Sequence, residues 1–322
     1  MKKVELGRTG QLVSQVSLGA MLMGTKTDEQ ESRRILDAYL DAGGDFVDTA
    51  DCYAWWVGPD HLGDESEELL GRWLPGKRDK VFLATKVSAR ITDFPAARVH
   101  GGGPYYEGAG ADVIKRGIDA SLRRLGTDHV DLYYVHVDDM STPLEETLAA
   151  LDSIVRAGKV RYIGWSNVRT WRLERIRALA LANGWTVPVA VQQQHSYLRP
   201  AGGVDTTSVV SDEMLHYLRV HDDITLLPYS PILSGIYDDA ERRAGHPIWQ
   251  QYAGSDSESR LAKAAKVASD LGVTVNQVAL AWLLHQEPRV VPIVGPRTWA
   301  HWEGYSAAFD LSLSAEQLAL LS

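Results

Sequence analysis

Short hydrophobic runs alternate with longer amphipathic segments along this chain of 322 residues. Most of the runs are apolar on both faces, which is the pattern of strands covered by helices. Pro292 falls in the last run and should limit that strand, because proline cannot donate a ladder hydrogen bond. The predicted strands are residues 13–20, 45–50, 81–87, 130–136, 160–165, 187–193, 224–230 and 290–294.

Helix start signals stand between these runs. For a helix over residues 143–157, we expect Thr142 as the N-cap and Glu145 as its capping-box partner, with Pro143 in the first helical position. Another helix is expected to begin at Thr274, with Gln277 three residues later.

Eight strands that alternate with helices predict a (β/α)8 TIM barrel over residues 1–322 as one domain. A doubly wound sheet is the alternative, but the residues after the first run, Gly19-Ala20-Met21-Leu22-Met23-Gly24, lack the glycine spacing of a dinucleotide-binding turn. Residues 3–16 are predicted to form a β-hairpin that closes the bottom of the barrel.

Two connections, residues 89–111 and 231–257, are unusually long. Both follow carboxyl ends of strands, so we expect them over the barrel mouth, where loops shape a ligand site. For the glycine-rich tip at Gly101–Gly103, an exposed insertion without function is the alternative.

Composition narrows the function classes. The formal net charge of −9 argues against nucleic acid or an anionic membrane as a main partner. Cys52 is the only cysteine, which excludes an intrachain disulfide and fits a reducing cytoplasm. The first residues do not resemble a signal peptide.

Polar residues follow three successive predicted strands. Asp48 lies near the end of the second run, Lys86 near the end of the third and His136 at the end of the fourth, and Tyr53 comes shortly after Asp48. Carboxyl ends of barrel strands converge on one face, so these four side chains should meet. Singly, each has an ordinary structural explanation, such as a surface ion pair or a packed aromatic; together they predict a shared site.

The residue types suggest a chemistry. Tyr53 can deliver a proton if a nearby cation such as Lys86 lowers its pKa, and Asp48 can hold that lysine charged. His136 can orient a substrate oxygen. No nucleophile or metal-ligand spacing is evident, so hydride addition to a carbonyl is the natural complement.

The order of these residues and several intervening motifs resemble the aldo-keto reductase family, with short-tailed bacterial members as the nearer likeness. The resemblance extends along essentially the whole chain. The most specific segments are GDFVDTADCY at 44–53, ESEELLG at 65–71, TPLEET at 142–147 and AGKVRYIGWSN at 157–167.

The resemblance implies an NADP(H)-dependent carbonyl reductase with Tyr53 as general acid, Lys86 and Asp48 as the pair that lowers its pKa, and His136 as the orienting residue. It implies that Tyr229 stacks on the nicotinamide, although an ordinary rim aromatic is the alternative. It also implies nicotinamide carboxamide contacts from Ser166, Asn167 and Gln192, and pyrophosphate contacts from Ser230, Ile232, Ser234 and Gly235.

At the adenosine end, Gly295 and Arg297 match the family's phosphate-binding position, with Arg297 as the candidate for the 2′-phosphate. Family members often carry a Glu-Asn pair about eight residues later, where this chain has Gly304-Tyr305. Tyr305 is therefore a candidate to stack on adenine, and NAD(H) is the alternative cofactor.

The chain also departs from the family after Tyr53, where a longer loop carries Trp55 and Trp56. They are candidates for a wall of the substrate pocket, with packing beneath the loop as the alternative. We expect a small carbonyl compound or alcohol as the substrate, and aromatic walls fit an apolar or a sugar-like compound equally well, so the sequence leaves the particular substrate open. Two rival functions are a non-catalytic nicotinamide-binding regulatory subunit and a phosphate-binding barrel isomerase or lyase. The sequence leaves the oligomeric state open.

Overall fold

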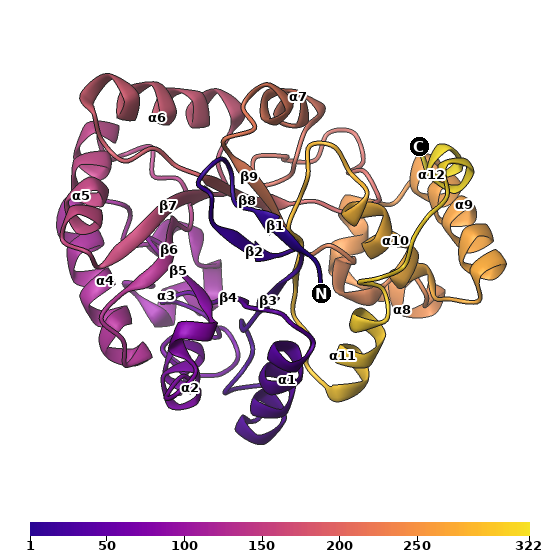
Figure 1. Cartoon of the computed structure of the whole chain (residues 1–322), viewed down its shortest axis with the longest axis horizontal. Coiled ribbons are helices and arrows are strands. Elements are labelled where there is room, and N and C mark those ends of the chain that lie inside the picture. Colours follow the sequence, from indigo (N-terminus) through magenta and orange to yellow (C-terminus); the bar gives the residue numbers. More distant parts are fainter.

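Eight parallel strands form one sheet that curves into a barrel in a computed structural model of residues 1–322 (Figure 1). The strand order is β10-β3-β4-β5-β6-β7-β8-β9, and a parallel bridge between Leu226 and Val290 connects the two edges. The predicted (β/α)8 barrel is therefore confirmed. Its strands are β3 (Ser17–Gly19), β4 (Phe46–Asp48), β5 (Phe82–Val87), β6 (Val130–Val135), β7 (Val160–Ser166), β8 (Ala190–Gln194), β9 (Thr225–Tyr229) and β10 (Ile293–Val294).

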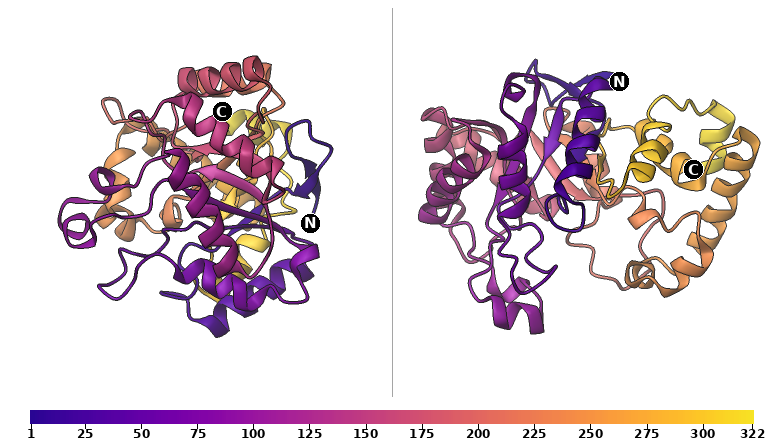
Figure 2. Two further views of the ribbon diagram at one scale, coloured as in Figure 1. Left: turned by 90° about the vertical axis from the view of Figure 1, so that its left-hand side faces the viewer. Right: turned by 90° about the horizontal axis from the view of Figure 1, so that it is seen from below.

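Helices pack around the outside of the sheet, and their buried stripes form a continuous hydrophobic core with the outward side chains of the strands. The C-terminal helices extend to one side of the barrel (Figure 2). The helices are α1 (Glu29–Asp41), α2 (Glu65–Trp73), α3 (Phe94–His100), α4 (Ala111–Leu125), α5 (Leu144–Arg156), α6 (Thr170–Asn183), α7 (Asp212–Val220), α8 (Ala240–Gly245), α9 (Ser255–Leu271), α10 (Val275–Leu284), α11 (Trp299–Ser306) and α12 (Ala315–Leu321).

The N-terminal hairpin pairs β1 (Lys3–Glu5) with β2 (Leu12–Ser14). Its side chains Leu6 and Val13 are fully buried against residues at the amino ends of the barrel strands, among them Phe46 and Phe82. The hairpin thus closes the bottom of the barrel, as predicted. The predicted first strand, residues 13–20, is divided between the hairpin and β3, because the chain turns between them.

The two predicted helix starts have different outcomes. Thr274 and Gln277 form the predicted capping box at α10. The capping box at α5 is wrong: Pro143 is the N-cap, and no side chain caps it. The Asp139 carboxylate binds Thr142 instead: it accepts from the Thr142 hydroxyl at 2.6 Å and from the Thr142 backbone N–H at 3.3 Å.

The two long connections contain short helices. Residues 89–111 include α3 and a 3-10 turn, Gly103–Tyr105. Residues 231–257 include α8 and two 3-10 turns, Leu233–Gly235 and Pro247–Gln251. Both follow the carboxyl ends of their strands, β5 and β9, so they border the end of the barrel at which the predicted catalytic residues lie.

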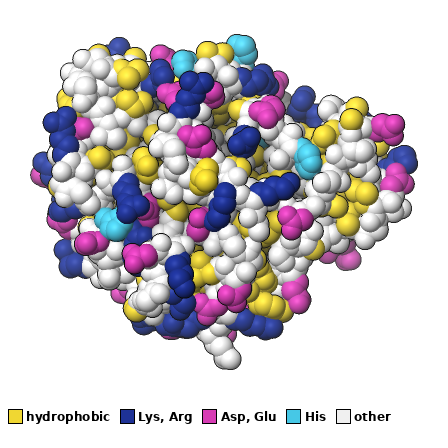
Figure 3. Space-filling view, in the orientation of Figure 1, with side chains coloured by type: hydrophobic (Ala, Val, Ile, Leu, Met, Phe, Trp, Pro, Cys, Tyr) yellow, Lys and Arg dark blue, Asp and Glu magenta, His cyan; other side chains and the backbone are white.

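No individual helix has the length and apolar character needed to cross a membrane, although the sharply bent pair α9 and α10 would meet both criteria together. On the face shown in Figure 3, basic and acidic side chains are interspersed and hydrophobic ones are scattered between them. That face therefore carries no extended patch of one charge.

Candidate active site

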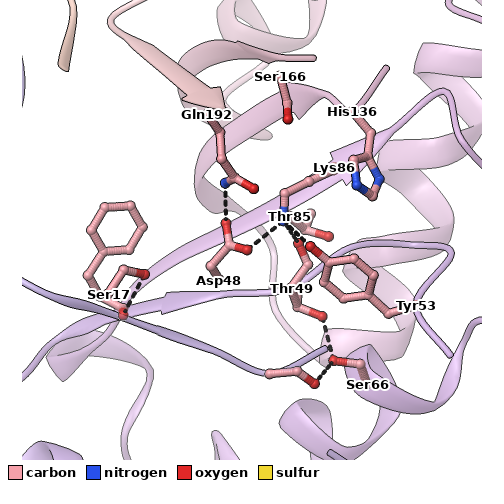
Figure 4. A network of polar contacts seen from close by, with 12 residues as sticks. Ser17, Asp48, Thr49, Tyr53, Ser66, Thr85, Lys86, His136, Ser166 and Gln192 are labelled. Atoms are coloured by element: carbon pink, nitrogen blue, oxygen red, sulfur yellow. Dashed lines mark hydrogen bonds and ion pairs between the residues drawn. The ribbon is translucent and has the colours of Figure 1, made fainter. Parts of the chain in front are cut away.

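The structure brings the four predicted catalytic residues together. Asp48 is the last residue of β4, Lys86 lies near the end of β5, and His136 directly follows β6. Tyr53 lies on the loop after β4 and points back toward Lys86 (Figure 4). Adjacent parallel strands in register place these side chains side by side, since Asp48 pairs with Ala84 and Lys86 with Tyr134.

Lys86 is the centre of the polar network (Figure 4). Its side chain is fully buried, and Nζ donates to Asp48 Oδ1 at 2.5 Å, to Tyr53 Oη at 2.7 Å and to the Thr49 carbonyl at 2.8 Å. An ammonium group has three protons, so every donor is used. The lysine is consequently fixed against the tyrosine hydroxyl.

The pKa of Tyr53 differs in direction from the sequence-based expectation. We expected Lys86 to lower it, but burial raises the pKa of Tyr53 well above its ordinary value, and the Asp48 carboxylate raises it further. Burial also lowers the pKa of Lys86 and raises that of Asp48. For all three residues, the free-energy cost of removing the charged form from water exceeds the electrostatic attraction between Lys86 and its two neighbours. The phenol of Tyr53 is therefore a protonated donor.

His136 lies edge-on to the Tyr53 ring, with 5.6 Å between the ring centroids. Burial lowers its pKa well below the ordinary value, so the imidazole is neutral. Cys52 is buried, and its Sγ lies 3.4 Å from His136 Nδ1. That contact gives the cysteine a neighbour in the site that no pattern in the sequence indicated.

A cavity of about 400 Å³ opens beside these groups. Asp48, Tyr53 and His136 line it, whereas Lys86 lies behind them. Trp55 and Trp56 also line the cavity, so the loop after Tyr53 contributes to its wall. The sequence did not single out Tyr106, Met21, Ala89 or Val137, which line the same cavity.

The residues expected at a nicotinamide carboxamide lie on the same cavity. Ser166 ends β7, and Asn167 adopts a left-handed conformation with a φ of 53°. Asn167 Oδ1 accepts a hydrogen bond from Tyr229 Oη at 2.8 Å, which fixes the tyrosine at the cavity edge. Gln192 Nε2 donates to Asp48 Oδ2 at 2.9 Å, so this glutamine also links the candidate catalytic residues to the candidate cofactor site.

The segment after β9 continues along the cavity. Ser230, Ile232 and Ser234 line it, and Gly235 borders a second cavity beyond. Ser230 and Ser234 both have positive φ values, 52° and 62°, which non-glycine residues adopt rarely. Backbone strain of this kind concentrates at ligand sites, where the surrounding fold enforces it.

The second cavity carries the expected adenosine residues. Gly295, Arg297 and Tyr305 line it, and Gly295 and Tyr305 also line the first cavity, so the two cavities adjoin; together they are called the groove. The sequence reasoning missed Arg242, His246 and Asn276, which border the same end. They come from α8, the turn after it and α10, and only the folding of these segments places them near Arg297.

The donor set along this groove fits a dinucleotide. Amide and hydroxyl side chains stand at the end near Tyr53, and two arginines, Arg242 and Arg297, stand at the far end. Arginine is suited to phosphate recognition because its planar fork provides several donors with a fixed charge. A barrel with a proton-donating cluster and such a groove at the carboxyl ends of its strands defines the class of barrel oxidoreductases.

Comparison with known proteins makes this assignment specific. The model of the aldo/keto reductase family matches residues 15–322, and the chain belongs to that family. An uncharacterized oxidoreductase of Bacillus subtilis, YrpG, is 32% identical over 100% of this chain and 95% of its own length. An aryl-alcohol dehydrogenase [NADP(+)] of Phanerodontia chrysosporium is 30% identical over 99% of this chain and 86% of its own length.

A solved structure agrees with the fold. The thermostable aldo-keto reductase Tm1743, determined with the inhibitor epalrestat, superposes with a TM-score of 0.74 at 28% identity. The match covers 100% of this chain and 98% of that one.

Proposed function

We propose that this protein is an NADP(H)-dependent reductase that converts an aldehyde or ketone into an alcohol. The observation that carries the proposal is the buried Lys86 ammonium, bonded to both Asp48 and Tyr53 beside a cavity. Two family members with similar sequences are named as an NADP(+)-dependent aryl-alcohol dehydrogenase and a norsolorinic acid reductase of Aspergillus parasiticus. Their names are consistent with a small carbonyl compound or alcohol as substrate.

Each of these side chains has a separate role in the proposed reaction. Tyr53 donates its phenolic proton to the carbonyl oxygen, and the ammonium of Lys86, 2.7 Å from Tyr53 Oη, stabilises the phenolate that remains. The neutral His136 orients the same oxygen by a hydrogen bond. NADPH, when bound, supplies the hydride for the carbonyl carbon, so hydride and proton together account for the alcohol.

The cofactor would be held along the groove. Ser166, Asn167 and Gln192 are the proposed partners of the carboxamide, and Tyr229 is the proposed stacking residue. Arg297 and Arg242 favour NADP(H) over NAD(H), because the additional 2′-phosphate brings charge that two arginines at this end would neutralise. Tyr305, whose ring stacks at 6.1 Å on His301, is the proposed adenine contact.

The Tyr53→Phe variant tests the assignment of the proton donor. It keeps the ring and removes only the hydroxyl, so we expect carbonyl reduction to fall by about 100-fold or more with NADPH binding retained. Turnover and the quenching of intrinsic fluorescence by NADPH measure the two effects separately. Near wild-type turnover of the variant would exclude Tyr53 as the general acid.

The same assay discriminates the rival functions. A regulatory subunit would bind NADPH without reducing any aldehyde, and a barrel isomerase or lyase would not bind NADPH. We favour the reductase because all four proton-delivery residues are present and in contact or close to one another. Residues 1–322 as one barrel domain, and a cytoplasmic location, remain part of the proposal.

A further inference from the structure

The cavity next to Tyr53 has a distinct chemical character. Among the residues that line the cavity, Asp48 is the only one with a carboxylate or a fixed charge, and this carboxylate already accepts hydrogen bonds from Lys86 and Gln192. No lysine or arginine lines the cavity. Away from the candidate catalytic and cofactor residues, the lining includes the apolar or aromatic side chains of Met21, Trp55, Trp56, Ala89, Tyr106 and Val137. A charged substrate would lose its hydration there without gaining a partner.

Two adjacent tryptophans form much of this wall. Trp55 and Trp56 pack edge to face, with ring centroids 5.9 Å apart and an angle of 89° between the rings. Trp55 is only 8% exposed, whereas Trp56 is 44% exposed and lies at the mouth of the cavity. Mutually perpendicular rings present both a face and an edge, and each makes favourable contacts with a flat aromatic ligand.

Residues 91–106 pack against the loop that carries Trp55 and Trp56. Trp55 packs against Ile91 and Ala97, and Phe94 and Tyr106 extend this cluster. Arg98 Nη2 donates to the carbonyl groups of Gly58, Pro59 and His61, which belong to the loop that carries the tryptophans. The wall is thus a fixed structure with a second layer behind it.

Gly102 is the tightest point of this second layer. A Cβ atom at this position would lie 2.9 Å from Trp55 Cζ2 and 3.0 Å from Tyr106 Cε1. The distance to Trp55 is shorter than real Cβ atoms show, and the distance to Tyr106 is tighter than most such contacts, so one of the two rings or the glycine segment would have to move. Both rings line the cavity, whereas Gly102 does not.

We propose that the site takes an uncharged, flat aromatic aldehyde or ketone, and that Gly102 is a specificity-determining position that sets the spacing of Trp55 and Tyr106. This inference rests on the proposed carbonyl reductase function and names its substrate class. It also assigns a role to the glycine-rich tip: the missing side chain lets residues 91–106 approach the cavity wall closely.

A substrate panel tests the class. The purified chain, with NADPH, is given methyl 4-formylbenzoate, 4-carboxybenzaldehyde, propanal and glyceraldehyde. We expect kcat/KM for the neutral ester to exceed that for its carboxylate analogue and for both aliphatic aldehydes by about 10-fold or more. Equal values for the ester and the acid would overturn the uncharged class. Faster reduction of the aliphatic aldehydes would overturn the aromatic class.

A matched pair of glycine variants tests the specificity position. Gly102 has a φ of −71°, so Gly102→Ala adds a methyl group without forcing the backbone into a disfavoured region. Gly103→Ala is the control, because nothing lies within 4 Å of its Cβ position. We expect Gly102→Ala to lower kcat/KM for the aromatic ester by about 10-fold, through KM, and to change that for propanal by less than about 2-fold.

Gly103→Ala should behave as the wild type with both substrates. Equal profiles of the two variants, or an equal loss of both substrates in Gly102→Ala, would overturn the role of Gly102. Direct binding of the aromatic ester, followed by calorimetry, should weaken in Gly102→Ala only. Failure of the proposed function itself gives a different result: no aldehyde in the panel would be reduced, in any variant.

Discussion

Cys52 Sγ lies 3.4 Å from His136 Nδ1, and this contact joins the loop that carries Tyr53 to the residue after β6. Burial raises the pKa of the Cys52 thiol well above its ordinary value and lowers that of His136, so both groups are neutral. We expect the thiol to donate to Nδ1, which leaves the ring hydrogen on Nε2 as a donor for a substrate oxygen.

Cys52 is therefore predicted to be a positioning residue for His136. Cys52→Ala should lower kcat/KM by about 3- to 10-fold, whereas Cys52→Ser, which keeps a donor, should retain most of it. The 15N chemical shifts of His136 report the tautomer directly, and we expect the Nε2–H form in the wild type and the serine variant. An unchanged tautomer in the alanine variant would show that the contact is only packing.

The pH dependence of reduction follows from the two pKa directions. The pKa of His136 is well below its ordinary value and that of Tyr53 is well above. Neither group changes its protonation state between about pH 6 and 9, so kcat/KM for reduction should be flat across this range. Alcohol oxidation needs the Tyr53 phenolate and should rise with pH. A bell-shaped reduction profile centred near neutral pH would contradict this account.

Asp51 is predicted to reduce stability at high pH. It is 1% exposed, its Oδ1 has no hydrogen-bond partner, and burial together with Glu67 raises its pKa well above the ordinary value. The folded chain therefore binds this proton more tightly than the unfolded chain. The free energy of unfolding should fall as the pH rises from about 4 through the raised pKa.

Asp51→Asn removes the charge while keeping the shape, so it should raise the free energy of unfolding at pH 8 by about 1–2 kcal/mol and leave it little changed at pH 4. Urea denaturation at the two pH values measures the difference. The exposed Asp60 provides the control, and Asp60→Asn should leave the pH dependence unaltered. A stability loss in Asp51→Asn at pH 8 would mean that the ionised carboxylate is stabilising.

The arginines at the far end of the groove are predicted to select the cofactor. Arg297→Ala and Arg242→Ala should each raise the Kd of NADPH by about 10-fold and leave the Kd of NADH nearly unchanged. Fluorescence titration with both nucleotides measures this, and Arg175→Ala, an exposed arginine on α6, serves as the control. An equal effect on both nucleotides would place the arginines away from the 2′-phosphate.

Much of the fold could be predicted from the sequence because its signals are local. Eight apolar runs alternating with helical patterns require a covered parallel sheet, and the glycine spacing of a doubly wound sheet is missing. The short hairpin and the capping box at Thr274 depend on neighbouring residues and were also predictable. The capping box at Thr142 failed because Pro143 is the N-cap, and the Asp139 carboxylate accepts from both the hydroxyl and the backbone N–H of Thr142.

The sequence by itself indicated which residues could deliver a proton, since Asp48, Lys86 and His136 lie at the carboxyl ends of strands that must converge. Only the tertiary structure decided the pKa direction of Tyr53, because desolvation depends on everything packed around the phenol. It also decided the neighbours of Cys52, Gly102 and Arg242. Each of these three lies on a loop or a short helix, and each has a neighbour from a segment distant in the chain: His136 for Cys52, Trp55 for Gly102 and the Arg297 segment, at the same cavity, for Arg242. No local pattern encodes the approach of such segments.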